Sequence, residues 1–134
     1  LRGGDDISLL GTGTMSYQLL VAANILAEQG INAEVVHVPT IKPLDEETIL
    51  TRVRKTGRVL SAEEAQIKGG FGGAIAELLS EKLPTPLRRV GMLDRFGESG
   101  APNELLDYFG LTGAKIAETA KEFTDNTSKY HQEY

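Results

Sequence analysis

Glycines and small hydroxyl residues form the first segment of this chain that could bind a ligand. The run Gly11-Thr12-Gly13-Thr14 joins a short apolar stretch to a segment with helical periodicity. Backbone amides at a helix start attract anions, and glycine lets a phosphate approach closely. The run lacks the third glycine of a dinucleotide-binding motif and the Gly-Lys-Ser/Thr of a P-loop. We therefore expect a structural strand-to-helix turn, and keep an anion site at these four residues as the alternative.

A pair of acidic residues before a glycine-rich turn is the second candidate. Glu63 and Glu64 end a strand-like run, and Gly70 and Phe71 belong to the turn that follows. Open α/β sheets bind ligands at the carboxyl ends of their strands, but successive strand residues point to opposite faces. The two carboxylates are therefore not expected to form a coupled acid–base pair. We predict that one of them reaches a loop amide or a neighbouring subunit, and that the glycines let the next helix start close to the sheet.

The third candidate is a charged loop near the end of the chain, Asp94-Arg95-Phe96-Gly97-Glu98-Ser99-Gly100. Its two acids, its arginine and its serine could form a network across an interface. A self-contained loop held by Asp94 and Arg95 is the equal alternative. Ser99 lacks the Gly-x-Ser-x-Gly frame of a nucleophile elbow, so this loop is not expected to supply a nucleophile.

The amino-acid composition argues against several kinds of site and partner. The 134 residues include no cysteine, which excludes a disulfide framework and a thiolate nucleophile and fits a reducing cytoplasm. Only His37 and His131 carry imidazoles, and His37 is flanked by valines, so we predict a structural role for it and no metal site. The net charge of −5 and the lack of a basic run or long apolar stretch argue against nucleic-acid and membrane partners.

The elements that must position these residues follow from the hydrophobic pattern. Strands are predicted at 7–10, 33–38, 58–62 and 87–90, alternating with helices, with Asp45 capping the second helix and Gly57 ending it. This alternation is typical of an α/β domain with three α/β/α layers around a mostly parallel open sheet. We assign the domain to residues 1–124 and expect the polar tail 125–134 to be loosely ordered. Because the sequence opens with Leu1 rather than Met, we expect it to lie within a longer gene product.

The order of four motifs adds a family resemblance. The fragments DDISLLGTGTM, VPTIKPLDEETI, SAEEAQIKGGFGGAIAELL and RVGMLDRFGESGAPNELLDYFGLT occur in this order and together cover residues 4 to 123. They resemble the C-terminal domain of transketolase, a thiamine-diphosphate-dependent enzyme. The resemblance implies a mixed sheet of about five strands with one antiparallel strand, which we place around residues 91–93. It departs from the family at Ala65, where many relatives have histidine, so no role is carried over to that position.

The resemblance also implies a function for the whole enzyme. Transketolases transfer a two-carbon ketol unit from a ketose phosphate to an aldose phosphate, using thiamine diphosphate and Mg²⁺ between their first two domains in a homodimer. The diphosphate–metal signature Gly-Asp-Gly is absent here. We therefore predict an assembly and dimer-interface domain that binds no cofactor, is inactive alone, and has the remaining transketolase domains or subunit as partners. Phe71 and Phe96 are the predicted apolar anchors.

Three other interpretations stay open. The chain is alternatively a small-anion or nucleotide-binding regulatory module that uses residues 11–14. It is alternatively the C-terminal domain of a 2-oxoacid dehydrogenase beta subunit, with an acyltransferase core as partner, or of deoxyxylulose-phosphate synthase.

Overall fold

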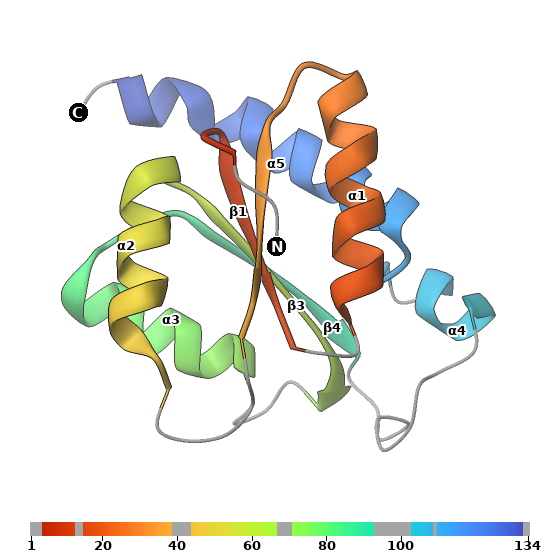
Figure 1. Cartoon of the computed structure of the whole chain (residues 1–134), viewed down its shortest axis with the longest axis horizontal. Coiled ribbons are helices and arrows are strands. Elements are labelled where there is room, and N and C mark those ends of the chain that lie inside the picture. Colours follow the sequence, from red (N-terminus) through yellow and green to blue (C-terminus); the bar gives the residue numbers. More distant parts are fainter. Residues whose placement is uncertain are drawn as a thin grey trace.

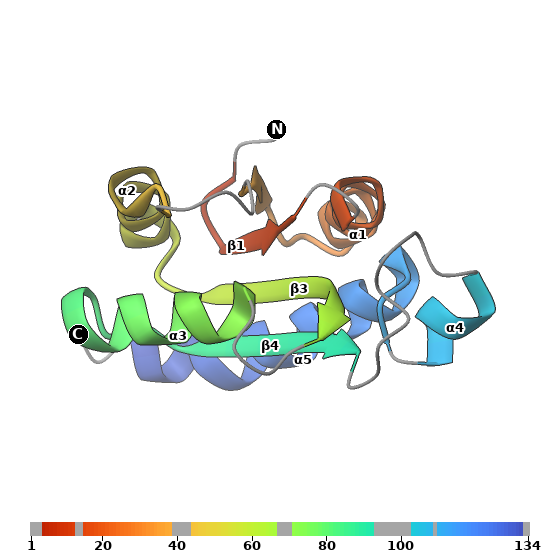
Figure 2. The same ribbon diagram turned by 90° about the horizontal axis from the view of Figure 1, so that it is seen from below.

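A parallel sheet lies between two layers of helices (Figures 1 and 2). The computed structural model describes residues 4–12, 15–38, 44–66, 71–92, 103–108 and 110–132. The strands are β1 (Ile7–Gly11), β2 (Ala33–His37), β3 (Val59–Gln66) and β4 (Leu87–Met92). The helices are α1 (Ser16–Glu28), α2 (Glu46–Thr56), α3 (Phe71–Lys82), α4 (Asn103–Tyr108) and α5 (Gly113–Gln132). The predicted α/β class with layers on both sides of an open sheet is confirmed.

The sheet has the order β2-β1-β3-β4, and every neighbouring pair within the described residues is parallel. The expected short fifth strand around residues 91–93 is wrong for Gly91 and Met92, because both belong to the end of β4. Gly91 pairs with Glu63 of β3 and Met92 with Gln66, so the parallel ladder reaches both residues, with a register shift between Glu63 and Gln66. Residue 93 lies outside the described residues.

Helices cover both faces of the sheet and create two separate cores. The first core joins β1 and β2 to α1 and α5 through side chains such as Leu9, Leu26 and Ile116. The second joins the opposite face to α2 and α3 through side chains such as Val36 and Ile75. All five residues of β1 are buried, which is the pattern of a central parallel strand covered on both faces.

The predicted N-cap of α2 at Asp45 and its predicted end at Gly57 are both confirmed. Asp45 precedes the helix, and its Oδ1 accepts a hydrogen bond from the Thr48 amide at 3.3 Å. Gly57 follows the helix in the left-handed conformation, with a φ of 77°, and its amide donates to the Val53 carbonyl. A residue with a Cβ would be strained at this position.

Helix α5 is longer than its sequence indicated. It continues to Gln132, so the expectation of a loosely ordered tail is wrong for residues 125–132. Lys121 and Asp125 form an ion pair of 3.0 Å one helical turn apart, and the Thr127 hydroxyl donates to the Phe123 carbonyl at 2.8 Å. Local contacts of this kind stabilise the polar part of the helix.

Candidate functional site

The carboxyl ends of the four described strands lie at one edge of the sheet, because the strands are parallel. The strands end there at Gly11, His37, Gln66 and Met92. Ligands of open α/β sheets bind outside this edge. Among the described residues singled out from the sequence, Gly11, Glu63 and Phe71 lie at this edge or at the helix start beside it.

Close packing requires a glycine at position 11. A Cβ at Gly11 would lie 2.6 Å from Leu19 Cδ1 and 3.3 Å from the Ala62 carbonyl oxygen, so a side chain has no room there. Thr12 accepts a hydrogen bond from the Met15 amide through its carbonyl at 2.9 Å, and α1 begins directly afterwards. These contacts support the structural interpretation of the turn. Gly13 and Thr14 lie outside the described residues, and the anion site over residues 11–14 stays a prediction.

Glu63 holds the start of α3. Its side chain crosses from the end of β3 to the helix, where Oε2 accepts from the Phe71 amide at 3.1 Å and Oε1 from the Gly72 amide at 2.8 Å. Two of the amides that a helix leaves without internal partners are thereby satisfied. Of the two acids, Glu63 thus reaches backbone amides at the start of α3, where the prediction had named a loop amide or a neighbouring subunit.

The pKa of Glu63 is subject to two opposing effects, burial and contacts that favour the ionised form. Its residue surface is only 5% exposed, and burial raises the pKa of the carboxyl above its ordinary value. The amides of Gly72 and Phe71 and the nearby charge of Arg89 oppose this rise in pKa, because they favour the ionised form. A carboxylate already occupies the position at this helix start that a bound anion would take.

Gly72 lets Glu63 approach the helix. A Cβ at Gly72 would lie 3.0 Å from Glu63 Oε1, 3.0 Å from Arg89 Nε and 3.4 Å from Ser61 Oγ. At Gly73, by contrast, the nearest atom is Arg89 Nη2 at 3.9 Å. This agrees with the expectation that glycine permits close packing of the helix start against the sheet.

The remaining predicted site residues divide into two groups. Phe71 is partly buried and packs against the second core, so it contributes to the fold, and its role as an interface anchor stays a prediction. The side chain of Glu64 lies outside the described residues. So do the residues Gly70, Asp94, Arg95, Phe96, Glu98 and Ser99. Their interface role also stays a prediction.

His37 is exposed at the end of β2, and its Nδ1 lies 3.3 Å from the Ser16 hydroxyl at the start of α1. This contact links a strand end to a helix start, as expected of a structural histidine. The carboxylates and imidazoles do not converge: among the described ranges no group of three or more could hold a metal ion.

The sequence did not reveal a buried carboxylate at Glu34. Its side chain is almost fully buried, and Oε1 pairs with Arg52 Nη1 at 2.9 Å and with Lys55 Nζ at 3.1 Å. Oε2 accepts from the Ser8 hydroxyl at 3.3 Å. The sequence did contain one hint of this network, the i, i+3 spacing of Arg52 and Lys55 on α2. The hint could not be connected to Glu34 without knowing that β2 lies beside that helix. The network lies near the amino ends of β1 and β2, away from the candidate site, and it holds α2 against the sheet.

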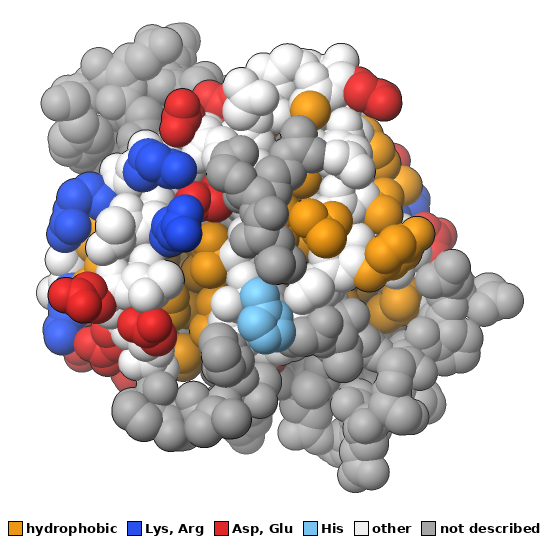
Figure 3. Space-filling model, in the orientation of Figure 1, with side chains coloured by type: hydrophobic (Ala, Val, Ile, Leu, Met, Phe, Trp, Pro, Cys, Tyr) orange, Lys and Arg blue, Asp and Glu red, His pale blue; other side chains and the backbone are white. Residues whose placement is uncertain are grey.

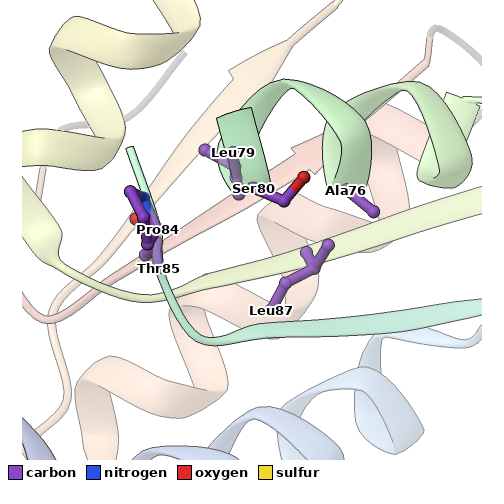
Figure 4. A pocket seen from close by; sticks show the side chains of 6 residues that line it. All are labelled: Ala76, Leu79, Ser80, Pro84, Thr85 and Leu87. Carbon is purple, nitrogen blue, oxygen red and sulfur yellow. The ribbon is translucent and has the colours of Figure 1, made fainter. Parts of the chain in front are cut away.

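An apolar depression of about 300 Å³ opens between α3 and the start of β4 (Figure 4). Its lining residues are Ala76, Leu79, Ser80, Pro84, Thr85 and Leu87. The hydroxyls of Ser80 and Thr85 already donate to the backbone carbonyls of Glu77 and Leu83. The depression therefore lacks the convergent polar groups that orient a ligand.

None of the helices in the described part of the chain is both long and apolar enough to cross a bilayer.

Comparison with known proteins gives consistent matches. The family model described as transketolase, C-terminal domain, matches residues 1–116. The 6-deoxy-6-sulfo-D-fructose transketolase subunit SqwH of Clostridium sp. (strain MSTE9) is 50% identical over 125 residues, which are 93% of this chain and 39% of that protein. The 1-deoxy-D-xylulose-5-phosphate synthase of Trichormus variabilis (strain ATCC 29413 / PCC 7937) is 44% identical over 119 residues, 88% of this chain and 19% of that protein.

Among solved structures, a split gene transketolase described as an inactive beta4 tetramer superposes with a TM-score of 0.82 and 39% sequence identity. The superposition covers 92% of this chain and 41% of that one. The present chain thus spans about a fifth to two fifths of the length of these relatives.

Proposed function

Because this chain belongs to the family of transketolase C-terminal domains, we propose that it is the assembly domain of an enzyme that transfers two-carbon ketol units between sugar phosphates. The proposed partners are the remaining transketolase domains or subunit and further copies of this chain. The proposed domain is residues 1–124, with the polar end of α5 appended to it.

One observation carries this proposal. The two relatives that are most alike in sequence and in structure, among those described above, are both parts of transketolases: a subunit acting on 6-deoxy-6-sulfo-D-fructose and a chain of a split gene transketolase. Each matches more than nine tenths of this chain. The second forms a tetramer of its beta chains, which supports assembly with copies of the same polypeptide.

The chemistry is assigned to other parts of the enzyme. Thiamine diphosphate with Mg²⁺ supplies the carbanion stabilisation that ketol transfer needs. The described residues do not fit this cofactor, because no cluster of acidic or imidazole side chains could hold the metal. The start of α3, which would suit a diphosphate, already holds the carboxylate of Glu63. The function proposed for this chain is therefore to bind and orient other parts of the enzyme.

A second candidate is the corresponding domain of a 1-deoxy-D-xylulose-5-phosphate synthase. The observation that favours it is the 44% identity to such an enzyme over 88% of this chain. Its identity is lower than that of the transketolase subunit, which makes it the alternative.

Activity of the native assembly distinguishes these functions. The enzyme that contains this sequence would be purified with an antibody against it and supplied with thiamine diphosphate and Mg²⁺. We expect ketol transfer to an aldose phosphate from a ketose phosphate or from 6-deoxy-6-sulfo-D-fructose, and no activity from the 134-residue chain alone. Formation of 1-deoxy-D-xylulose 5-phosphate without ketol transfer would support the alternative, and absence of both reactions would contradict both functions.

A further inference from the structure

Strand β4 is the last strand on one side of the sheet. In the order β2-β1-β3-β4 it has a single neighbour among the described strands, and Figure 2 shows it beyond β3 at the border of the sheet. The Val59 amide of β3 donates to the Pro86 carbonyl at 3.0 Å, so the backbone groups of Arg88, two residues further on, also point to β3. Those of Leu87 and Arg89 point the opposite way. No described strand pairs with them, which makes β4 a template for a further strand.

Two adjacent arginines on β4 set this strand apart from the charged surface of α2. Arg88 and Arg89 are both exposed, and they lie on opposite faces of the sheet, with Arg89 on the face that α3 covers. On α2 the basic side chains are accompanied by acids: Arg52 pairs with Glu34, and Figure 3 shows acidic side chains beside basic ones over that helix. Within the described residues neither β4 arginine forms an ion pair, although the charge of Arg89 favours the ionised form of nearby Glu63.

The apolar depression between α3 and β4 opens beside the same strand. Leu87 points from β4 toward α3, and Ala76 and Leu79 of the helix also line the depression (Figure 4). Its volume of about 300 Å³ has room for one large aliphatic side chain. The depression lacks polar groups that would orient a ligand, but backbone pairing along β4 would supply that orientation to a side chain of an added strand.

We propose that β4 binds an extended acidic segment from another part of the enzyme, which adds a strand to the sheet and seats one apolar side chain in the depression. The inference rests on the assembly function proposed above. Main-chain hydrogen bonds give an added strand its affinity, and the pockets beside it give specificity. The arginines select an acidic partner, because cross-strand pairs of opposite charge are stabilising and those of like charge are destabilising. Two copies of β4 placed edge to edge would bring their arginines together, so a second copy of this chain is disfavoured here.

An antiparallel segment on β4 has a defined order of residues. The residue opposite Leu87 is apolar, those opposite Arg88 and Arg89 are acidic, and the one opposite Val90 is β-branched, because Val90 packs against the first core. From its amino end the segment therefore has the order Val-Glu-Glu-Leu. The residues opposite Leu87 and Arg89 exchange both hydrogen bonds with them. The amides of the Leu and of the first Glu thus point to β4, and the amide of the second Glu points away.

Hydrogen exchange resolved to single residues tests whether this edge is occupied in the native enzyme. The amides of Leu87 and Arg89 should exchange at least about tenfold more slowly in the native assembly than in the 134-residue chain. The amide of Arg88 is the internal control, because it points to β3 and should be protected in both. Equal exchange of Leu87 and Arg89 in the two states would overturn the proposal. Protection that instead grew with the concentration of the isolated chain would identify a second copy as the occupant, and would equally overturn it.

A synthetic peptide tests the chemistry of the partner. Fluorescein-labelled Thr-Val-Glu-Glu-Leu-Thr-amide should bind the 134-residue chain saturably below about 1 mM, measured by fluorescence anisotropy. N-methylation of its Leu should weaken binding about tenfold or more, because it removes a hydrogen bond to β4. The same modification on the second Glu, whose amide points away, should leave binding unchanged.

Arg88→Glu should also raise the dissociation constant of the peptide about tenfold or more, since it places like charges opposite each other. Arg54→Glu is the matched control: it makes the same charge change at an exposed position on α2 and should bind the peptide like wild type. Thermal melting checks that both variants fold.

Absence of saturable binding, equal binding of the two N-methylated peptides, or an Arg88→Glu chain that binds like wild type would each overturn the proposal. Ketol transfer by the native assembly is assayed separately, so its absence would contradict the proposed function whatever the peptide binds.

Discussion

Two helices on opposite sides of the β2 edge of the sheet, α1 and α2, are built in contrasting ways (Figure 1). Helix α2 is stabilised at both ends by its own side chains. Asp45 caps its start, acidic residues occupy its first turn, and basic residues occupy its last turn. Helix α1 has no side-chain cap, no acid in its first turn and no base in its last. Its stability must come from packing, since the helix ends contribute little.

Their outer faces differ in the same way. Arg52 and Lys55 of α2 pair with buried Glu34 while keeping about half of their side chains exposed. The outer face of α1 presents Tyr17 and half-buried aliphatic side chains. The contrast indicates that α2 is stabilised largely by polar groups at its ends and on its outer face, whereas α1 is stabilised largely by packing.

The largest expected effect concerns the packing of α1. Leu26 is fully buried in the first core, and Leu26→Ala should lower the free energy of unfolding by about 2–5 kcal/mol, measured by urea denaturation. Tyr17→Ala on the exposed face should change it by less than about 0.5 kcal/mol. Similar losses for the two variants would contradict the division of α1 into a buried and an exposed face.

A smaller effect is expected at the helix starts. Asp45→Ala removes the hydrogen bond to the Thr48 amide and should cost about 0.5–2 kcal/mol of unfolding free energy. Ser16→Ala at the start of α1 removes only an exposed contact to His37, so we expect a clearly smaller loss in the same assay. Equal losses would show that α1 relies on its end as much as α2 does.

The smallest effect is the pH dependence that Glu63 contributes. Its pKa is raised in the folded chain, so the folded state holds this proton more tightly than the unfolded state does. The contribution of Glu63 to stability is therefore fully present below the ordinary carboxyl pKa and is lost as the pH rises through the raised pKa.

Glu63→Gln should remove this slope, and Glu47→Gln, at an exposed carboxylate of α2, should leave it in place. The measurement is the free energy of unfolding at a series of pH values for the three chains. A steeper fall in stability with rising pH in Glu63→Gln than in wild type would show that the pKa of Glu63 is shifted in the other direction.

Features that depend on neighbours in sequence were predictable. The cap at Asp45, the stop at Gly57 and the four strands follow from propensity and periodicity, and the structure confirms them. That an acid at the end of β3 would reach a nearby backbone amide was also predictable, because a strand end and the next helix start must meet at the same edge.

Features that depend on distant partners were not predictable. Glu34 looks like an ordinary strand residue until β2 is placed beside α2, whose cations neutralise it. Arg89 lies near Glu63 only because β4 pairs with β3. The length of α5 was underestimated because its final turns are polar and have no hydrophobic period to reveal them.

Titration of thiamine diphosphate with Mg²⁺ into the 134-residue chain tests most directly the claim that this domain contributes assembly rather than chemistry. The native assembly is the positive control, and calorimetry measures both. The account predicts binding to the assembly and none to the isolated chain at micromolar cofactor. Micromolar binding to the isolated chain would contradict it, and would place part of the cofactor site within these residues.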